Sequence, residues 1–215
     1  MSTTSPDIPR PRFARMYLGA AARAEERGAG DHRRTLLAGL RGRVVEIGAG
    51  HGLNFPYYPT HVSEVVAVEP EPTLRAQAER AASRAQVKVT VLPGAADELP
   101  LADASVDAAV ASLVLCSVPD QSRALAELRR VLRPGGELRF YEHVLASGKG
   151  RAWIQNRVAR FWPLVGGGCH PNRDTVAAIE RAGFGIERCE RFCFQPAPLA
   201  VHVTPHVIGA ARKPG

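Results

Sequence analysis

Hydrophobic positions along the chain fall into short apolar, β-branched runs that alternate with longer stretches rich in Ala, Leu, Arg and Glu. Strands that alternate with helices of about 10–15 residues indicate a parallel sheet with right-handed crossovers. The apolar runs predict strands over residues 43–48, 64–68, 87–92, 106–113, 137–143, 186–194 and 202–212. The longer stretches predict helices over residues 72–85, 120–132 and 173–182.

The ends of this pattern define the domain organisation that we expect. Residues 1–12 are rich in Ser, Thr and Pro and predict a loose tail, and residues 13–40 predict two short helices, broken at Gly28-Ala29-Gly30. We assign 1–40 to an N-terminal tail and helices, and 41–215 to one α/β domain with a helical insertion near 150–165. A chain of 215 residues with 45% hydrophobic residues is long enough for one sizeable core.

A glycine-rich turn, Gly48-Ala49-Gly50-His51-Gly52, follows the first predicted strand, and a helix-length stretch comes after it. Glycines there permit a tight turn and let a ligand approach the backbone, and a ligand anion could meet the N-terminus of the helix. Glu69 follows the second strand, 19 residues beyond Gly50. An acidic side chain at an offset of roughly 20 residues reaches ribose hydroxyls in nucleotide-binding α/β folds. A turn used only for packing and an exposed strand-end carboxylate are the alternatives.

The spacing of the glycines separates two cofactor classes. The dinucleotide fingerprint requires a third glycine at position 53, where this chain has Leu53. The Glu-x-Gly-x-Gly-x-Gly spacing that begins at Glu46 instead resembles the first motif of class I methyltransferases, which bind S-adenosylmethionine. The resemblance implies a Rossmann-like fold: a mainly parallel seven-stranded sheet with helices on both faces and an antiparallel last strand. It also implies that the loop holds the methionyl part of the cofactor and Glu69 the ribose.

Two further motifs agree with this family over most of residues 43–143. The stretch 94–100, followed by Ser105-Val106-Asp107, resembles the adenine-contact loop and fourth strand, and Leu132 to Gly136 resembles the turn before strand five. Many relatives carry Asp after the glycine of the adenine loop, whereas this chain has Ala95, so adenine recognition would pass to Ala96 and Asp97. The resemblance implies the following cofactor-binding residues: Glu46, Gly48, Gly50, Gly52, Asn54, Glu69, Pro70, Ala96, Asp97 and Leu113.

Less generic segments resemble the alkyl thiol methyltransferases, which are microsomal membrane enzymes in animals, and their bacterial relatives. The segments are Asn54-Phe55 with Tyr58-Pro59, residues 113–118, Glu142-His143-Val144, Gly168-Cys169 with Arg173, and Pro205-His206. This chain lacks the apolar N-terminal anchor of the animal enzymes. The resemblance implies methyl transfer from S-adenosylmethionine to the sulfur of a small apolar thiol. A quinone-like ring carbon or phenolic oxygen as acceptor, and a cofactor-binding protein without activity, are the alternatives.

Substrates of open α/β sheets bind beyond the carboxyl ends of the strands, where Cys116, Glu142 and His143 fall. A thiol acceptor must lose its proton, and free thiols have a pKa near 8.5. His143 is the best-placed base, with His170 and His206 as others, and a structural role is the alternative for each. Glu142 could orient a histidine or bind a substrate amine, or form a structural salt bridge. We expect Cys116 to be a buried small residue, because methyl transfer needs no enzyme nucleophile.

The net charge of +7 and the pI near 9.7 come mainly from arginines scattered over helices and loops, without a basic run interleaved with aromatic residues. This pattern favours a solvated surface over a nucleic-acid interface. Four cysteines without a leader sequence indicate a reduced, cytoplasmic protein. Cys189 and Cys193 have no second ligand pair at zinc-site spacing, so we expect no metal site.

Two segments of the sequence indicate whether the protein could span or contact a membrane. The longest apolar run, residues 108–116, is far shorter than the roughly 18–20 residues of a membrane span. The insertion carries Trp153, Phe161 and Trp162, with arginines between them. Such an amphipathic segment could cap the substrate pocket or lie on a membrane surface. We favour the cap, which would enclose a small-molecule acceptor.

Overall fold

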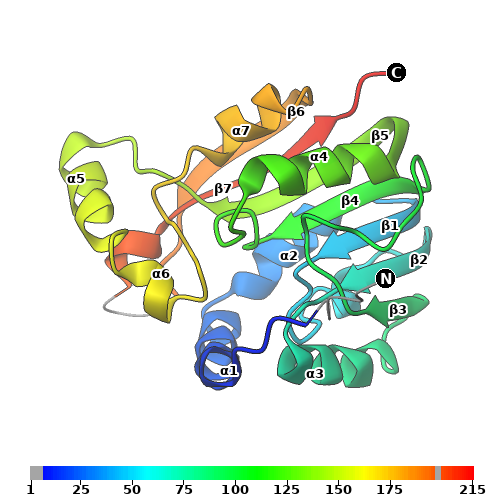
Figure 1. The fold of residues 1–215 in the computed structure, drawn as a ribbon, viewed down its shortest axis with the longest axis horizontal. Coiled ribbons are helices and arrows are strands. Elements are labelled where there is room, and N and C mark those ends of the chain that lie inside the picture. Colours follow the sequence, from blue (N-terminus) through cyan, green and yellow to red (C-terminus); the bar gives the residue numbers. More distant parts are fainter. Residues whose placement is uncertain (1–6, 197–199) are drawn as a thin grey trace, which may run out of the picture.

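The computed structural model describes residues 7–196 and 200–215, and its centre is one seven-stranded sheet (Figure 1). The strand order is β3-β2-β1-β4-β5-β7-β6. All neighbouring strands are parallel except β7, which runs antiparallel to both β5 and β6. The strands are β1 (Gly42–Ile47), β2 (Val62–Val68), β3 (Val89–Leu92), β4 (Val106–Ser112), β5 (Leu132–His143), β6 (Gly185–Cys193) and β7 (Pro205–Arg212). The predicted fold class is confirmed.

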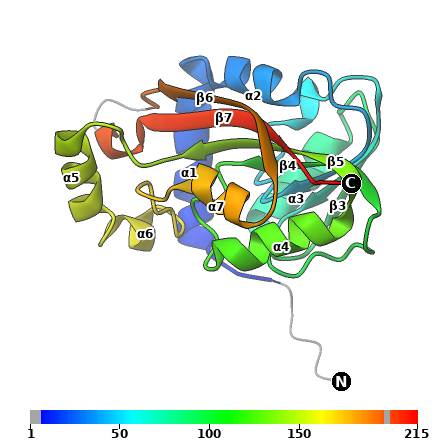
Figure 2. The same ribbon diagram turned by 90° about the horizontal axis from the view of Figure 1, so that it is seen from above.

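Helices cover both faces of the sheet, as Figure 2 shows for α4 and α7 on one side and α2 on the other. The helices are α1 (Pro11–Glu26), α2 (Ala29–Leu37), α3 (Pro72–Ala82), α4 (Gln121–Val131), α5 (Lys149–Val158), α6 (Trp162–Val165) and α7 (Thr175–Arg181). Apolar side chains of α4 and α7 pack into one buried cluster, whereas α2 and α3 belong to a second. The sheet is therefore buried on both faces, which explains why its strands are continuous apolar runs.

Adjacent residues of the central strands point to opposite layers. In β1, Val44 belongs to the cluster under α2 and α3, and Val45 to the cluster under α4 and α7. In β2, Ala67 and Val68 divide in the same way. A Glu or Gly at the end of such a strand is thereby fixed in position by packing on both sides.

Two predictions about local structure are wrong. Instead of a helix, only a 3₁₀ turn, η1 (Phe55–Tyr57), follows the glycine-rich turn, so no helix N-terminus faces a ligand there. Pro56 and Pro59 explain the difference, because proline in a helix interior removes a hydrogen bond and clashes with the preceding turn. Strand β5 begins at Leu132 rather than at residue 137. The predicted turn 133–136 lies inside the strand, where the pairing with β4 shifts register.

Helix α1 and the insertion lie at the carboxyl edge of the sheet, where α1 and α6 appear in Figure 1. Helix α2 packs on the sheet, and Arg139 Nη1 of β5 donates to the carbonyl oxygen of Leu36 at 3.2 Å. The domain boundary at residue 40 stays a prediction. In the described ranges, no helix has both the length and the apolar character that crossing a membrane requires.

Candidate active site

A cavity opens at the carboxyl ends of β1, β2 and β4, where the sequence places the candidate residues. Its free space is about 1060 Å³ when the open solvent at its mouth is included. Seven of the ten predicted cofactor residues line it: Gly48, Gly50, Glu69, Pro70, Ala96, Asp97 and Leu113, which lies in the turn after β4. These seven residues therefore converge on one cavity.

The glycine-rich turn approaches the cavity with backbone only. Gly48 and Gly50 have φ values of +59° and +58°, which favour glycine. A Cβ on Gly48 would collide with the Val114 side chain, and one on Gly50 would lie 3.3 Å from the Tyr17 hydroxyl. Glycine at these positions therefore lets Val114 and Tyr17 pack directly against the backbone of the loop.

Glu69, at the end of β2, holds the loop that it faces. Its Oε2 accepts from the backbone N–H of Gly50 at 2.7 Å, and its Oε1 accepts from the N–H of Glu71 at 2.9 Å. Burial raises the pKa of Glu69 to about 7, although both hydrogen bonds favour the charged form. The carboxylate also lines the cavity, so it can accept hydrogen bonds from a ligand hydroxyl group.

Three predicted cofactor residues support the loop from behind and do not line the cavity. Glu46 is buried and accepts from Asn54 Nδ2 at 2.8 Å and from the Tyr58 hydroxyl at 2.7 Å. Arg33 donates to Asn54 Oδ1 at 2.9 Å. Burial raises the pKa of Glu46 to about 7. Gly52 is also internal, because a Cβ there would lie 2.6 Å from Phe55.

Helix α1 closes the cavity, which the sequence analysis did not anticipate. Phe13 and Tyr17 line the cavity, and their rings stack with centroids 5.6 Å apart. Arg10 Nη1 donates to the carbonyl oxygen of Gly167 at 3.0 Å, so the start of the chain contacts the loop after α6. Aromatic residues four positions apart share a helix face, and this spacing is the local signal that could have identified them.

The turn after β4 is held by Glu142, which is buried on β5. Its carboxylate accepts hydrogen bonds from the backbone N–H groups of Val114, Leu115 and Cys116 at 2.9–3.0 Å. Leu113, which begins the turn, has a φ of +59°, a strained value for a non-glycine residue. This arrangement favours a positioning role for Glu142, through the loop, over the direct contact with substrate that the sequence suggested.

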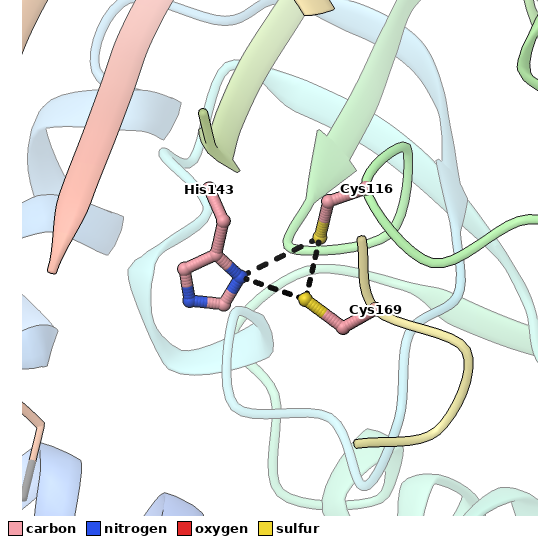
Figure 3. Close-up of side chains that lie close together, drawn as sticks. All are labelled: Cys116, His143 and Cys169. Carbon is pink, nitrogen blue, oxygen red and sulfur yellow. Dashed lines mark hydrogen bonds between the residues drawn. The ribbon is translucent and has the colours of Figure 1, made fainter. Parts of the chain in front are cut away.

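Cys116, His143 and Cys169 meet beside this turn, although they come from three separate segments (Figure 3). His143 Nδ1 lies 3.5 Å from each sulfur, and the two sulfurs are 3.8 Å apart. The hydrogen bond between the thiols raises the pKa of Cys116 and lowers that of Cys169. Cys116 is fully buried, as predicted, and Cys169 is nearly so. Cys169 lies in one of the segments by which the sequence resembles the alkyl thiol methyltransferases, but no spacing placed it beside the two predicted residues.

None of the three predicted bases, His143, His170 and His206, lines the cavity. His206 is buried on β7, and its Nδ1 lies 2.8 Å from the carbonyl oxygen of Thr204. Burial lowers the pKa of His206 to about 3, and burial also lowers the pKa of His170. His206 is therefore neutral over the physiological range. A catalytic role for either histidine, and for His143, stays a prediction.

The aromatic residues of the insertion do not cap the cavity directly. Trp153 and Phe161 are 61% and 70% exposed, and neither lines the cavity. Trp162 packs against His202 with ring centroids 4.1 Å apart. The loop after α6 does reach the cavity through Gly167. Within the insertion and the loop that follows it, this short segment, rather than the aromatic side chains, contacts the cavity.

The residues present fit S-adenosylmethionine. A backbone-only loop without room for side chains, a buried carboxylate on the cavity wall and an apolar lining that includes Leu74, Val114 and Val118 suit a ligand with a ribose, an adenine ring and a methionyl chain. Asp97 adds a further polar side chain to the lining. The fit depends on residues at or after the carboxyl ends of four of the five parallel strands, β1 to β4.

Solved structures share this fold at low identity. A SAM-dependent methyltransferase from Thermotoga maritima superposes with a TM-score of 0.70 over 94% of this chain and 97% of that chain, at 22% identity. The N-methyltransferase NodS from Bradyrhizobium japonicum gives 0.65 over 88% and 97%, at 18% identity. The [4+2]-cyclase SpnF gives 0.68 over 86% and 80%, at 21% identity. The fold alone therefore does not determine the reaction.

Sequence relatives are more specific. Residues 45–140 match a family described as a methyltransferase domain. Thiol S-methyltransferase TMT1B of Mus musculus is 38% identical over 186 residues, which are 82% of this chain and 74% of the relative. Thiol S-methyltransferase TMT1A of Homo sapiens is 36% identical with the same coverage. The chain therefore belongs to the S-adenosylmethionine-dependent methyltransferases, in the family that includes the thiol S-methyltransferases.

Proposed function

We propose that this methyltransferase transfers the methyl group of S-adenosylmethionine to the sulfur of a small apolar thiol. The observation that carries the proposal is the 36–38% identity to proteins named thiol S-methyltransferases over 82% of the chain. The site is compatible with it, because the turn that presents Cys116 and the segment around His143 are among those by which the sequence resembles this family.

The cofactor would be held by the turn 48–50, by Glu69 at the ribose and by Ala96 and Asp97 near the adenine. Bound there, S-adenosylmethionine supplies an electrophilic methyl group on a sulfonium. The residues of the chain then have three tasks: to orient the acceptor, to exclude water and to hold the cofactor rigidly. Glu69 contributes to the last task twice: its carboxylate would bind the ribose, and it also fixes the backbone of Gly50 in the turn.

The acceptor would lie on the apolar side of the cavity, where Phe13, Val114 and Val118 provide lining surface. An apolar wall favours a thiol with an alkyl or aryl group over a charged one. Helix α1 and the loop at Gly167 close this side, so they would exclude water once both ligands are bound. This arrangement supports small acceptors rather than a macromolecule.

The test is methyl transfer from labelled S-adenosylmethionine to a panel of alkyl thiols, phenols and quinols. We expect labelling of the thiols, and Glu69→Ala to lower it at a cofactor concentration just sufficient to saturate the native protein. Glu64→Ala, on the same strand but in surface ion pairs with Arg43 and Lys88, is the matched control and retains activity. Labelling of ring substrates alone would replace the thiol with a ring carbon or phenolic oxygen. Cofactor binding without transfer to any acceptor would indicate a protein without this activity.

A further inference from the structure

The atoms of the Cys116, His143 and Cys169 cluster form a nearly equilateral triangle. Its sides are 3.5 Å from Nδ1 to each sulfur and 3.8 Å between the sulfurs. In a regular tetrahedral zinc site, Zn–S bonds of about 2.3 Å and Zn–N bonds of about 2.0–2.1 Å place sulfurs about 3.8 Å apart and sulfur–nitrogen pairs about 3.5 Å apart. The three atoms thus already occupy the positions of three zinc ligands.

We propose that Cys116, Cys169 and His143 bind one Zn²⁺ ion and leave its fourth coordination position open for the sulfur of the acceptor thiol. The second half of this proposal rests on the proposed function. Within the ranges that the structure describes, no fourth Cys, His, Asp or Glu joins these three ligand atoms. Three protein ligands with one open position are typical of catalytic zinc, whereas structural zinc takes four.

The surrounding structure holds the ligands in place without the ion. The backbone N–H of Cys116 donates to Glu142 at 3.0 Å, which fixes the first cysteine on its turn. The N–H of His170 donates to the carbonyl oxygen of Cys116 at 2.7 Å, which fixes the loop of Cys169 beside that turn. His143 is the last residue of β5 and pairs in register with His206. A preorganised ligand set of this kind lowers the entropic cost of binding a metal.

Charge favours the same assignment. Two thiolates and a neutral imidazole around Zn²⁺ sum to zero, so the complex can be buried without an unpaired charge. Cys116 is 0% exposed and Cys169 is 5% exposed, whereas Cys189 and Cys193 are exposed on β6. The sequence-based expectation of no metal rested on the spacing of the exposed pair. The buried pair is 53 residues apart and carries no spacing signal.

The site lies against the cavity. Ser117 and Val118, directly after Cys116, line the cavity, as does Gly167, two residues before Cys169. A thiol that enters from the cavity would bind the ion as a thiolate and release its proton to solvent, with no change of oxidation state. A thiol-binding ion explains why a site for sulfur acceptors would carry two cysteines that methyl transfer itself does not require.

The first experiment measures the metal directly. Protein reduced with a non-thiol reductant, loaded with Zn²⁺ and freed of excess is expected to retain one zinc per chain, with sulfur and nitrogen neighbours in its zinc X-ray absorption spectrum. Cys169→Ser and His143→Gln are expected to lower the zinc affinity at least tenfold, and Cys189→Ser, at an exposed cysteine, to leave it unchanged. Thermal unfolding of the metal-free variants identifies any that do not fold. Retention of less than 0.1 zinc per native chain, or equal affinity in folded Cys169→Ser, overturns the proposal.

The second experiment tests the open position without turnover. In Co²⁺-loaded protein without cofactor, an alkyl thiol is expected to shift the thiolate-to-cobalt absorption bands, and the matching alkyl alcohol is not. Unchanged spectra at saturating thiol overturn the open position. The two proposals fail separately. Full thiol methylation by metal-free protein removes the role of zinc in binding the acceptor and leaves the proposed function. Zinc binding without thiol methylation removes the proposed function and leaves the metal site.

Discussion

The carboxylate of Glu69 accepts a hydrogen bond from the backbone N–H of Gly50 at 2.7 Å, across 19 residues of sequence. The bond joins the end of β2 to the turn after β1, which are neighbours in the sheet. The residue expected to hold the ribose therefore also sets the shape of the loop expected to hold the methionyl chain. Cofactor affinity and loop geometry depend on the same side chain.

Glu69→Ala is expected to weaken S-adenosylmethionine binding about 10- to 100-fold, which is about 1.4–2.8 kcal/mol. The substitution removes a ligand acceptor and leaves the N–H groups of Gly50 and Glu71 without their partner. Titration calorimetry of native protein, Glu69→Ala and the surface control Glu64→Ala measures the change. Equal affinity in folded Glu69→Ala would contradict the assignment of this carboxylate to the ribose.

Gly48→Ala is expected to destabilise the protein more than Gly39→Ala, by about 1–3 kcal/mol. Both positions have positive φ, +59° and +77°. Both variants are therefore destabilised by roughly 1–2 kcal/mol, because alanine is unfavourable in this backbone conformation. A Cβ at residue 39 meets open space, whereas at residue 48 it collides with Val114. Denaturant unfolding of the two variants isolates the effect of crowding.

Val114→Ala in the Gly48→Ala background is expected to restore part of the lost stability, because it removes the atoms that the new Cβ meets. The single variant Val114→Ala, which keeps Gly48, is the control. If the double variant is as unstable as the sum of the single changes, the crowding explanation fails.

Much of the fold could be predicted because the strands are buried on both faces. Continuous β-branched runs such as 65–68 then stand out from the intervening helices. The errors fall at prolines: Pro56 limits η1 to one turn, whereas β5 continues past Pro134 through a register shift, where the sequence predicted a turn. Such boundaries depend on local geometry that composition does not reveal.

The cofactor side of the site could be predicted because its residues follow successive strands at fixed spacings. The other side could not, because it depends on tertiary contacts. Arg10 and Gly167, which are 157 residues apart, bring α1 over the cavity. Cys169 reaches His143 through a loop that is held beside Cys116 by the bond from the N–H of His170 and beside α1 by the bond from Arg10 to Gly167. No periodicity or motif encodes these contacts.

Glu142→Gln is expected to lower the free energy of unfolding by about 1–3 kcal/mol, because it leaves a buried N–H without an acceptor. Oε1 accepts from Val114 and Leu115, and Oε2 from Cys116. A glutamine whose oxygen occupies the Oε1 position keeps the first two bonds and turns its NH₂ group towards the N–H of Cys116. Hydrogen exchange should therefore accelerate at Cys116 more than at Leu115. Uniform exchange across the turn would contradict this account.

Glu46→Gln is expected to reduce the dependence of stability on pH. Burial raises the pKa of Glu46 from 4.5 to about 7 in the folded protein. Between these values the unfolded chain binds fewer protons than the folded chain, so the free energy of unfolding falls as pH rises. The full shift corresponds to about 3 kcal/mol. Glu69, whose pKa is also raised to about 7, keeps its own contribution in the variant.

The measurement is urea unfolding of native protein and Glu46→Gln at intervals from pH 4.5 to 7.5. A glutamine has one acceptor oxygen, so the variant loses at least one of the bonds from Asn54 and Tyr58, which displaces its curve by an amount that does not change with pH. The difference in the free energy of unfolding between the two proteins should therefore move in favour of the variant as pH rises, and level off above about 7, the pKa of Glu46 in the folded protein. Parallel curves would mean that Glu46 is ionised throughout, stabilised by its hydrogen bonds and by Arg33 against the effect of burial.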